Sequence, residues 1–196
     1  MLKKKIIIGT RGSKLALWQA NHIASAIQKK HSDVVVVIQV IQTTGDRMQN
    51  MPLSQIGGKG LFTKEIEEEM LKGNVQLAVH SLKDVPTVLP ETLELIAYPE
   101  RASSADILVY KSEDIFEKEH RIIATGSLRR KAFWNHQYPT DTIVDLRGNV
   151  QLRLKKLQDN TDWDGAIFAF AGLDRSEILD ELKEKGLHYK VIDWLM

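Results

Sequence analysis

The sequence contains no cysteine among its 196 residues. A chain without thiols forms no disulfide and presents no thiolate as a nucleophile or a metal ligand. Its six histidines also lack a metal-ligand spacing such as H-E-x-x-H. We therefore predict no metal site, and we expect His80 to be a hydrogen-bonded residue at the end of a strand and not a ligand.

Long hydrophobic runs are absent as well. The apolar run near the N-terminus is Ile6 to Ile8, far short of the signal-peptide core of about 7 to 15 residues. No run approaches the roughly 20 apolar residues that span a bilayer. We expect a cytoplasmic protein that does not engage a membrane.

Excess charge of either sign is missing, because the net charge is only +1. This balance argues against a strongly basic nucleic-acid-binding protein. Neither G-x-x-x-x-G-K-[ST] nor G-x-G-x-x-G occurs in the sequence, so nucleotide binding has little support. We predict no nucleic-acid partner, although arginines clustered in loops can still form a local anion site.

The sequence does contain short apolar runs that alternate with helical patterns, which indicates an α/β fold with mostly parallel sheets flanked by helices. The predicted strands lie within residues 4–10, 33–46 (with a final turn), 75–81, 121–127, 141–146 and 163–172. The predicted helices lie within residues 16–27, 62–74, 128–137 and 149–158. Ser13 is a plausible N-cap of the first helix, and Gly73 is expected to end the second.

The two halves of the chain repeat the order of strand, Thr/Gly/Ser loop and helix. The loop at 10–13 is echoed at 125–127, although such residues are also common turn and capping residues in βα loops. A proline and a cluster of small residues in Tyr98–Asp106 mark a boundary. We predict two similar lobes, residues 1–99 and 100–196, with a cleft between them that binds ligands at the carboxyl ends of strands.

Basic side chains gather in the loops that follow the predicted strands. Arginine grips a planar carboxylate through two parallel hydrogen bonds, so this set favours a ligand with several carboxylates. The alternative for paired arginines is a solvated helix face. The basic loop residues are Arg11, Arg47, Lys59, Lys83, Arg129, Arg130, Arg147 and Arg153. Three glycines, Gly57, Gly58 and Gly60, surround Lys59 and suit a close approach of the backbone to a ligand.

Seven segments together resemble one family, porphobilinogen deaminase, also called hydroxymethylbilane synthase. They are "IIIGTRGSKLALWQ", "IGGKGLFTKEIEEEML", "AVHSLKDVPT", "ERASSADILV", "ATGSLRRKAFW", "DLRGNVQLRLKKL" and "AIFAFAGLDR", in family order along nearly the whole chain. The resemblance implies three domains, of which the first two are α/β lobes like those of type II periplasmic binding proteins.

The resemblance also implies a transferase of heme biosynthesis. Its reaction joins four porphobilinogen units head to tail, releases ammonia at each step and yields hydroxymethylbilane. A dipyrromethane cofactor is implied to prime the reaction and to hold the growing polypyrrole chain. Substrate, cofactor and product all carry carboxylates, which gives the loop arginines a purpose.

The same resemblance assigns roles to individual residues. Asp84 is implied to be the catalytic aspartate, a carboxylate that accepts pyrrole N–H bonds and stabilises positive charge as ammonia leaves. On local sequence alone, a turn residue before Pro86 is the favoured interpretation of Asp84, and the family resemblance reverses that preference. The positions implied to hold the cofactor are Lys59, Ser81, Lys83, Thr125, Ser127, Arg129, Arg130 and Arg153. The positions implied to hold the substrate are Arg11, Ser13, Arg147, Arg153 and Arg175, although Arg175 on its own suits an exposed surface residue.

Two departures from the family pattern stand out. Gly126 lies where the family often has a serine, so the hydroxyl of that serine is missing here. The family holds its cofactor through a cysteine in a third domain, whereas this sequence ends at Met196 without one. We expect a monomeric fragment that comprises the first two domains and is inactive alone. The rival interpretation is a non-catalytic two-lobed protein that captures a small anion.

Overall fold

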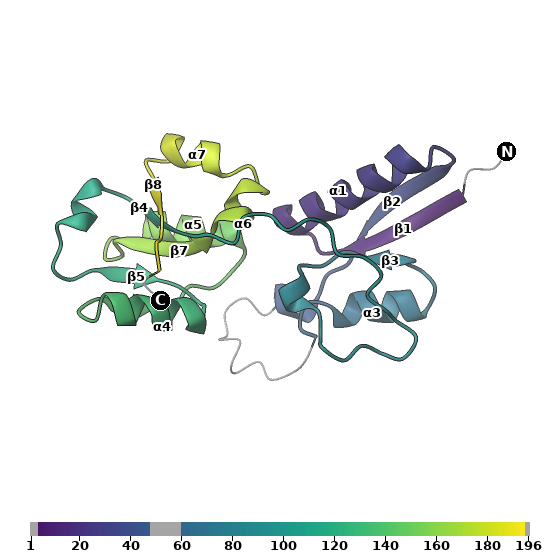
Figure 1. The fold of residues 1–196 in the computed structure, drawn as a ribbon, viewed down its shortest axis with the longest axis horizontal. Helices are drawn as coiled ribbons and strands as arrows, with labels where there is room; N and C mark the ends of the chain where they lie inside the picture. The colour runs from purple at the N-terminus through teal and green to yellow at the C-terminus, as the bar shows by residue number, and fades with distance from the viewer. Residues whose placement is uncertain (1–3, 48–59, 195–196) are drawn as a thin grey trace. The chain divides into compact units, whose positions relative to one another are not determined.

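The computed structural model describes residues 4–47 and 60–194. The chain divides into two compact units, Met1–Pro99 and Glu100–Met196. Figure 1 shows both units and labels most of their helices and strands. Among the described residues, no helix is both long enough and apolar enough to cross a membrane.

The first unit is a three-stranded parallel sheet with helices on both faces. Its strands are β1 (Lys4–Thr10), β2 (Val34–Val40) and β3 (Leu77–Ala78), in the spatial order β2-β1-β3. Its helices are α1 (Lys14–Lys30), α2 (Thr44–Arg47), α3 (Lys64–Leu71) and the short 3₁₀ helix η1 (Leu82–Asp84).

Successive residues of β1 explain how this sheet is covered. Ile8 is fully buried against Ala20 and Ala24 of α1, whereas a side chain at Gly9 would meet Ile66 of α3. Because neighbouring residues of a strand point to opposite faces, α1 and α3 cover opposite faces of the sheet. All three strands run in parallel, so their carboxyl ends lie along one edge of the first unit (Figure 1).

The second unit is a five-stranded sheet in the order β6-β5-β7-β4-β8. Its strands are β4 (Asp106–Tyr110), β5 (Ile122–Ala124), β6 (Thr142–Val144), β7 (Gly165–Ala169) and β8 (His188–Val191). Its helices are α4 (Leu128–Gln137), α5 (Val150–Asp159), α6 (Phe170–Asp174), α7 (Leu179–Glu184) and the 3₁₀ helix η2 (Glu113–Phe116).

The second sheet is mixed, which corrects the expectation of a mostly parallel one. Strand β5 pairs in parallel with β6 and β7, but β4 pairs in antiparallel fashion with both β7 and β8. Asp106, the first residue of β4, therefore lies opposite Ala169, the last residue of β7. The amino end of β4 thus joins the carboxyl ends of β5, β6 and β7 at one edge.

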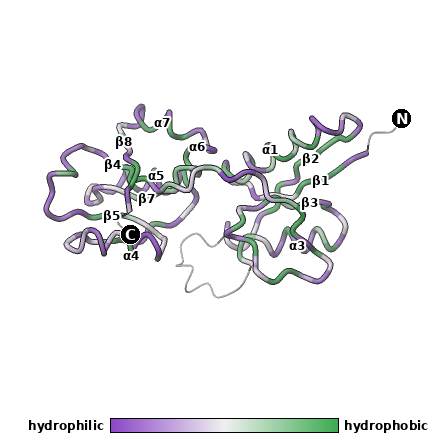
Figure 2. The backbone as a smooth tube through the Cα atoms, viewed as in Figure 1, coloured by the Kyte–Doolittle hydropathy of each residue, from purple (hydrophilic) through white to green (hydrophobic). Residues whose placement is uncertain are grey.

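The apolar core of the second unit follows the sequence pattern. Strand β4 is buried along its whole length, and Figure 2 shows hydrophobic residues along it. Ile107 and Val109 pack with residues of α5, α6 and α7, whereas Leu108 and Tyr110 pack with Trp134 of α4. This alternation places helices on both faces of the sheet, as expected for the α/β class.

Local signals in the sequence are largely confirmed. Ser13 caps α1 by accepting a hydrogen bond from the backbone N–H of Ala16 at 3.3 Å. Gly73 follows α3 with a φ of 78°, a conformation that glycine adopts without strain. The third strand is shorter than expected, because only Leu77 and Ala78 pair with β1.

Candidate functional site

Most of the predicted site residues of the second unit lie at one edge of its sheet, where the carboxyl ends of β5, β6 and β7 meet the amino end of β4. Thr125 follows β5 and accepts from the backbone N–H of Ser127 at 3.3 Å, and its own backbone N–H donates to Val144 at the end of β6. Ser127 is the N-cap of α4, and Asn149 is the N-cap of α5. Two helix N-termini therefore open toward this edge, and their free N–H groups favour anions.

Asp106 joins two of the predicted cofactor-binding arginines. Its Oδ2 atom accepts from Arg129 Nη2 at 2.9 Å, and its Oδ1 atom accepts from Arg130 Nε at 3.0 Å. The Asp106 side chain is 3% exposed, that of Arg130 is 13% exposed and that of Arg129 is 54% exposed. Burial alone raises the pKa of Asp106, but the bonds and charges of Arg130 and Arg129 outweigh it, so the pKa lies below its ordinary value.

Arg147 and Arg153 add positive charge at the same edge without a carboxylate of their own among the described residues. Arg153 donates from Nε to the carbonyl oxygen of Gly148 at 2.7 Å. Burial lowers the pKa of Arg153, and repulsion from Arg147 and Arg130 lowers it further. The Nε atom of Arg147 is buried and has no hydrogen-bond partner among the described residues. This arrangement leaves guanidinium donors available for an anion.

The loop between β5 and α4 is tightly packed at Gly126. A Cβ atom at this position would lie 2.5 Å from the carbonyl oxygen of Leu146, closer than real Cβ contacts allow. A serine side chain therefore does not fit here without a shift of the backbone. Thr125 is buried, so Ser127 is the hydroxyl residue of this loop that is partly exposed.

In the first unit, Arg11 is paired with a carboxylate that the sequence does not single out. Its Nε atom donates to Asp46 at 3.1 Å, and its guanidinium lies 4.1 Å from the centre of the Phe62 ring. Asp46 also accepts from the hydroxyl of Thr43 at 2.8 Å. Burial raises the pKa of Asp46, but the bonds from Arg11 and Thr43 outweigh it and hold the pKa below its ordinary value.

Asp84 and its neighbours follow β3 at the carboxyl edge of the same sheet. Asp84 ends the 3₁₀ helix η1 and is half-buried, and its carboxylate forms no hydrogen bond or ion pair with the rest of the described chain. Lys83 is exposed. The Ser81 hydroxyl accepts from the side-chain amide of Gln19, on α1, at 3.1 Å. A partly buried carboxylate without a partner can accept hydrogen bonds from a ligand.

His80 departs from the expectation of a fully hydrogen-bonded histidine. Its Nε2 atom is buried and has no partner among the described residues. Burial lowers the pKa of His80; the charges of Glu67 and Asp84 raise it, and that of Arg11 lowers it. The imidazole is therefore held toward its neutral form beside Asp84.

Three further predicted residues have separate positions. The Ser13 hydroxyl serves as the cap of α1. Arg175 is half-buried at the C-terminal end of α6, where its backbone N–H donates to Ala171 at 3.2 Å. Lys59 lies outside the described residues. The structure thus brings Arg129, Arg130 and Arg153 together in the second unit, and leaves the predicted roles of all these residues as proposals.

Sequence reasoning missed Asp46 and Asp106, the two carboxylates that organise the arginines. Each is far from its partner in the sequence, 35 residues for Arg11 and 23 for Arg129. Their position is the signal that could have identified them. Each aspartate lies beside the end of an apolar strand-like segment, at a sheet edge where a loop that carries an arginine also lies. Among residues 4–47 and 60–194, no group of three or more His, Cys, Asp or Glu residues could hold a metal ion.

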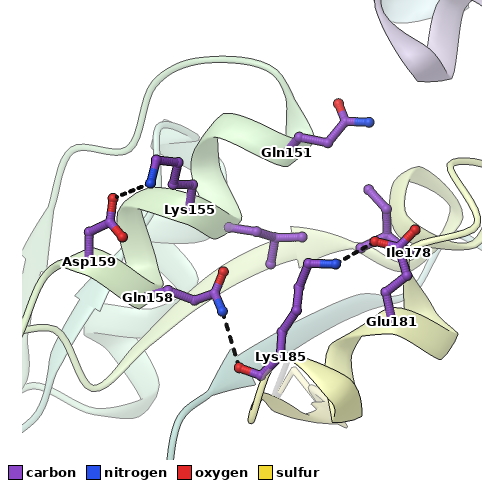
Figure 3. A pocket seen from close by; sticks show the side chains of 8 residues that line it. Gln151, Lys155, Gln158, Asp159, Ile178, Glu181 and Lys185 are labelled. Carbon is purple, nitrogen blue, oxygen red and sulfur yellow. Dashed lines mark hydrogen bonds and ion pairs between the residues drawn. The ribbon is translucent and has the colours of Figure 1, made fainter.

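A hollow of about 320 Å³ lies elsewhere in the second unit, between α5 and α7 (Figure 3). Figure 3 shows one contact across it, in which Gln158 donates to the carbonyl oxygen of Lys185 at 3.1 Å, whereas Lys155 pairs with Asp159 at 3.0 Å within α5. None of the predicted site residues lines this hollow. It is therefore separate from the candidate site.

Two similar curated relatives of the chain carry the same name. The chain is 49% identical over 183 residues to porphobilinogen deaminase of Sulfurimonas denitrificans, which covers 92% of this chain and 58% of that protein. It is 43% identical over 185 residues to porphobilinogen deaminase of Chlorobium phaeobacteroides, which covers 93% of this chain and 59% of that protein. The chain thus spans less than two thirds of the length of these relatives.

Solved structures show the same fold at low identity. The periplasmic VFT2 domain of Bordetella pertussis BvgS matches with a TM-score of 0.51 and 10% identity, over 97% of this chain and 76% of that one. A double mutant of that domain matches with a TM-score of 0.50 and 11% identity, over 97% of this chain and 75% of that one. The predicted α/β fold of the type II periplasmic-binding kind is thereby confirmed.

A family model matches residues 6–193, nearly the whole chain. Its description is "Porphobilinogen deaminase, dipyromethane cofactor binding domain". The relatives and the family model agree with the resemblance of the seven sequence segments. The chain belongs to the porphobilinogen deaminase family.

Proposed function

We propose that this chain supplies the ligand-holding and catalytic residues for the condensation of four porphobilinogen units to hydroxymethylbilane, with release of ammonia. Family membership supplies the reaction. The observation that carries the proposal is the surplus of guanidinium groups at the strand edge of the second unit, where Asp106 is the carboxylate paired with Arg129 and Arg130. Such a surplus suits a ligand that carries several carboxylates.

The residues of this edge fit a dipyrromethane cofactor, which carries carboxylates. The charged form of Arg153 is disfavoured by burial and by repulsion from Arg147 and Arg130, and a cofactor carboxylate beside it would offset that cost. The buried Nε–H of Arg147 lacks an acceptor among the described residues, and a carboxylate of the incoming substrate would accept from it. When bound, the cofactor supplies the primer to which pyrrole units are added. Arg129, Arg130, Arg153 and Ser127 are the residues of this unit proposed to hold its acid groups, beside Thr125.

Asp84 is proposed to act on pyrrole nitrogens and not on carboxylates. Its carboxylate has no partner within the described chain and follows a strand end, where a ligand N–H can donate to it. As ammonia leaves porphobilinogen, positive charge develops on the pyrrole ring. A fixed carboxylate at that position stabilises the charge without having to reorganise during the reaction.

Residues around Asp84 are proposed to orient the ligand. Lys83 presents an exposed ammonium group, and Ser81 presents a hydroxyl that is held by Gln19. These two, with Lys59, are proposed to hold cofactor acids. Arg11, Ser13, Arg147, Arg153 and Arg175 are proposed to meet the incoming substrate. The pairing with Asp46 fixes the orientation of the Arg11 guanidinium, so the N–H groups of Arg11 that do not contact Asp46 point in a fixed direction.

Titration calorimetry tests this proposal against the rival of a small-anion binding protein. Porphobilinogen, sulfate, phosphate and succinate would each be titrated into the chain at low ionic strength, because salt screens such contacts. We expect porphobilinogen to bind more tightly than the three simple anions. Tight binding of a simple anion with no binding of porphobilinogen would reject the proposal in favour of the rival.

Turnover is a separate part of the proposal. The family's cofactor is held through a thioether, and this sequence contains no cysteine. We therefore propose that the 196-residue chain binds ligand without sustained turnover. Incubation with porphobilinogen and measurement of hydroxymethylbilane tests this, and repeated turnover by the chain alone would refute it.

A further inference from the structure

Asp106 is the point at which two predicted ligand-binding arginines meet. Its Oδ1 atom contacts Arg130 through Nε at 3.0 Å and through Nη2 at 2.7 Å. Its Oδ2 atom contacts Arg129 Nη2 at 2.9 Å and also accepts from the indole N–H of Trp194 at 3.2 Å. With 3% of its surface exposed, this carboxylate is a buried anchor and not a surface charge.

The anchor uses only part of each guanidinium. A guanidinium has five N–H donors in a rigid plane, and Asp106 engages one edge of Arg130 and one nitrogen of Arg129. The other N–H groups remain available and keep fixed directions, because the plane cannot turn without breaking the contact. Arg129 is further held with its guanidinium 5.7 Å from the centre of the Phe133 ring.

The anchor also sets the charge of the edge. Arg129, Arg130, Arg147 and Arg153 bring four positive charges, and Asp106 cancels one of them. Without that cancellation, four guanidinium groups would attract any small anion that could sit among them. With it, the strongest attraction is for a ligand that places separate carboxylates at separate arginines.

We propose that Asp106 is a specificity-determining positioning residue, which aligns Arg129 and Arg130 and offsets one positive charge so that the edge selects polycarboxylates over single small anions. The proposal rests on the proposed function in taking porphobilinogen as the polycarboxylate. Its charge component stands without that assumption, because it concerns any anion.

The second unit offers a matched control in Asp141. This aspartate is also buried and also binds an arginine and a tryptophan, accepting from Arg121 Nε at 2.8 Å and from Trp134 Nε1 at 2.8 Å. It precedes β6, whereas Asp106 lies level with the strand ends that carry the candidate site. Asp141→Asn thus removes the same chemistry from the opposite edge of the same sheet, beside β6, which is separated from β4 by β5 and β7.

The test compares Asp106→Asn, Asp106→Glu and Asp141→Asn with the wild-type chain. Calorimetry would give the dissociation constants for sulfate and for porphobilinogen in the same low-salt buffer. We expect Asp106→Asn to bind sulfate about 5- to 30-fold more tightly, because one unit of positive charge is no longer cancelled. We expect the preference for porphobilinogen over sulfate to fall by about tenfold or more, because the two arginines lose their alignment. Asp141→Asn should leave both constants unchanged.

Asp106→Glu separates the effect of the negative charge at residue 106 from the effect of the alignment of the two arginines. It keeps the negative charge, so sulfate affinity should stay within about twofold of the wild-type value even if the alignment suffers. Sulfate tightening in Asp106→Glu as large as in Asp106→Asn would overturn the proposal. Equal sulfate affinity of Asp106→Asn and the wild type would also overturn it, as would the absence of detectable sulfate binding by both proteins. An equal tightening of sulfate binding in Asp141→Asn would overturn it as well.

The same data distinguish the two hypotheses. If the wild type fails to bind porphobilinogen while Asp106→Asn alone binds sulfate more tightly, the proposed function is refuted and the charge role of Asp106 is supported. If the wild type binds porphobilinogen and the preference is the same in Asp106→Asn, the proposed function survives and the inference is refuted.

Discussion

Replacing Arg153 with glutamine tests whether it is a ligand-binding arginine, as proposed, or a structural one. Arg153 is held by a 2.7 Å hydrogen bond to Gly148 and has no carboxylate partner among the described residues. Burial and repulsion from Arg147 and Arg130 both act against its charge. Arg153→Gln removes that repulsion and keeps an N–H donor, although it loses part of the side chain's packing.

The structure gives the expected magnitudes. Loss of packing and relief of repulsion act in opposite directions, so the free energy of unfolding should change by no more than about 1 kcal/mol. Loss of a charged hydrogen bond to a ligand carboxylate costs about 1.5 to 3 kcal/mol, which corresponds to a roughly 10- to 150-fold weaker affinity for porphobilinogen. Urea unfolding and calorimetry measure the two quantities.

Arg121 provides the opposite case. Its side chain is 12% exposed, it pairs with Asp141 at 2.8 Å, and it lies 4.3 Å from the centre of the Tyr138 ring. Arg121→Gln should lower the free energy of unfolding by about 3 to 5 kcal/mol, because it leaves a buried carboxylate unpaired. Porphobilinogen affinity of the folded protein should not change. The reasoning would be refuted if Arg153→Gln were the destabilised variant and kept normal affinity.

Three more substitutions have defined outcomes. Within a protein that turns over porphobilinogen, Asp84→Asn should reduce turnover by about 10²- to 10³-fold and change the free energy of unfolding by under about 0.5 kcal/mol; near-normal turnover would remove Asp84 from the mechanism. In Gly126→Ala the new Cβ would lie 2.5 Å from the Leu146 carbonyl oxygen, so the free energy of unfolding in urea should fall by about 1 to 3 kcal/mol. Gly172→Ala, whose nearest contact would be at 4.0 Å, should not lower it. Equal effects of the two substitutions would contradict the packing argument. Because Asp106 has a lowered pKa in the folded state, its stabilising effect is present above the unfolded pKa of about 3.9 and is lost as pH falls through the folded value. Urea unfolding from pH 7 to pH 3 should show a weaker acid dependence for Asp106→Asn, and an unchanged slope would contradict the assignment.

Local features of the fold could be predicted from the sequence because their causes are local. The cap at Ser13 and the glycine after α3 are signals within a few residues of the helix ends that they mark. Helix α4 spans residues 128–137 as predicted, because its capping serine and its apolar spacing lie within the same segment.

Features that depend on distant partners could not be predicted in the same way. The direction of β4 is set by its pairing with β7, some 60 residues later in the chain, so periodicity alone does not fix it. The roles of Asp46 and Asp106 depend on arginines in other loops, and a lone aspartate near a strand end looks like an ordinary turn residue. His80 shows the same effect, because hydrogen-bond satisfaction depends on what packs around it.

The most direct test of the central claim follows the side-chain Nε–H resonances of Arg147 and Arg153 by nuclear magnetic resonance during a porphobilinogen titration. The Nε–H of Arg147 has no acceptor among the described residues, whereas that of Arg153 already donates to Gly148. We predict that both resonances shift along one saturable binding curve, with the larger change at Arg147, because a ligand carboxylate gives that donor its first partner. Saturable binding of porphobilinogen that leaves both resonances unmoved would contradict the account.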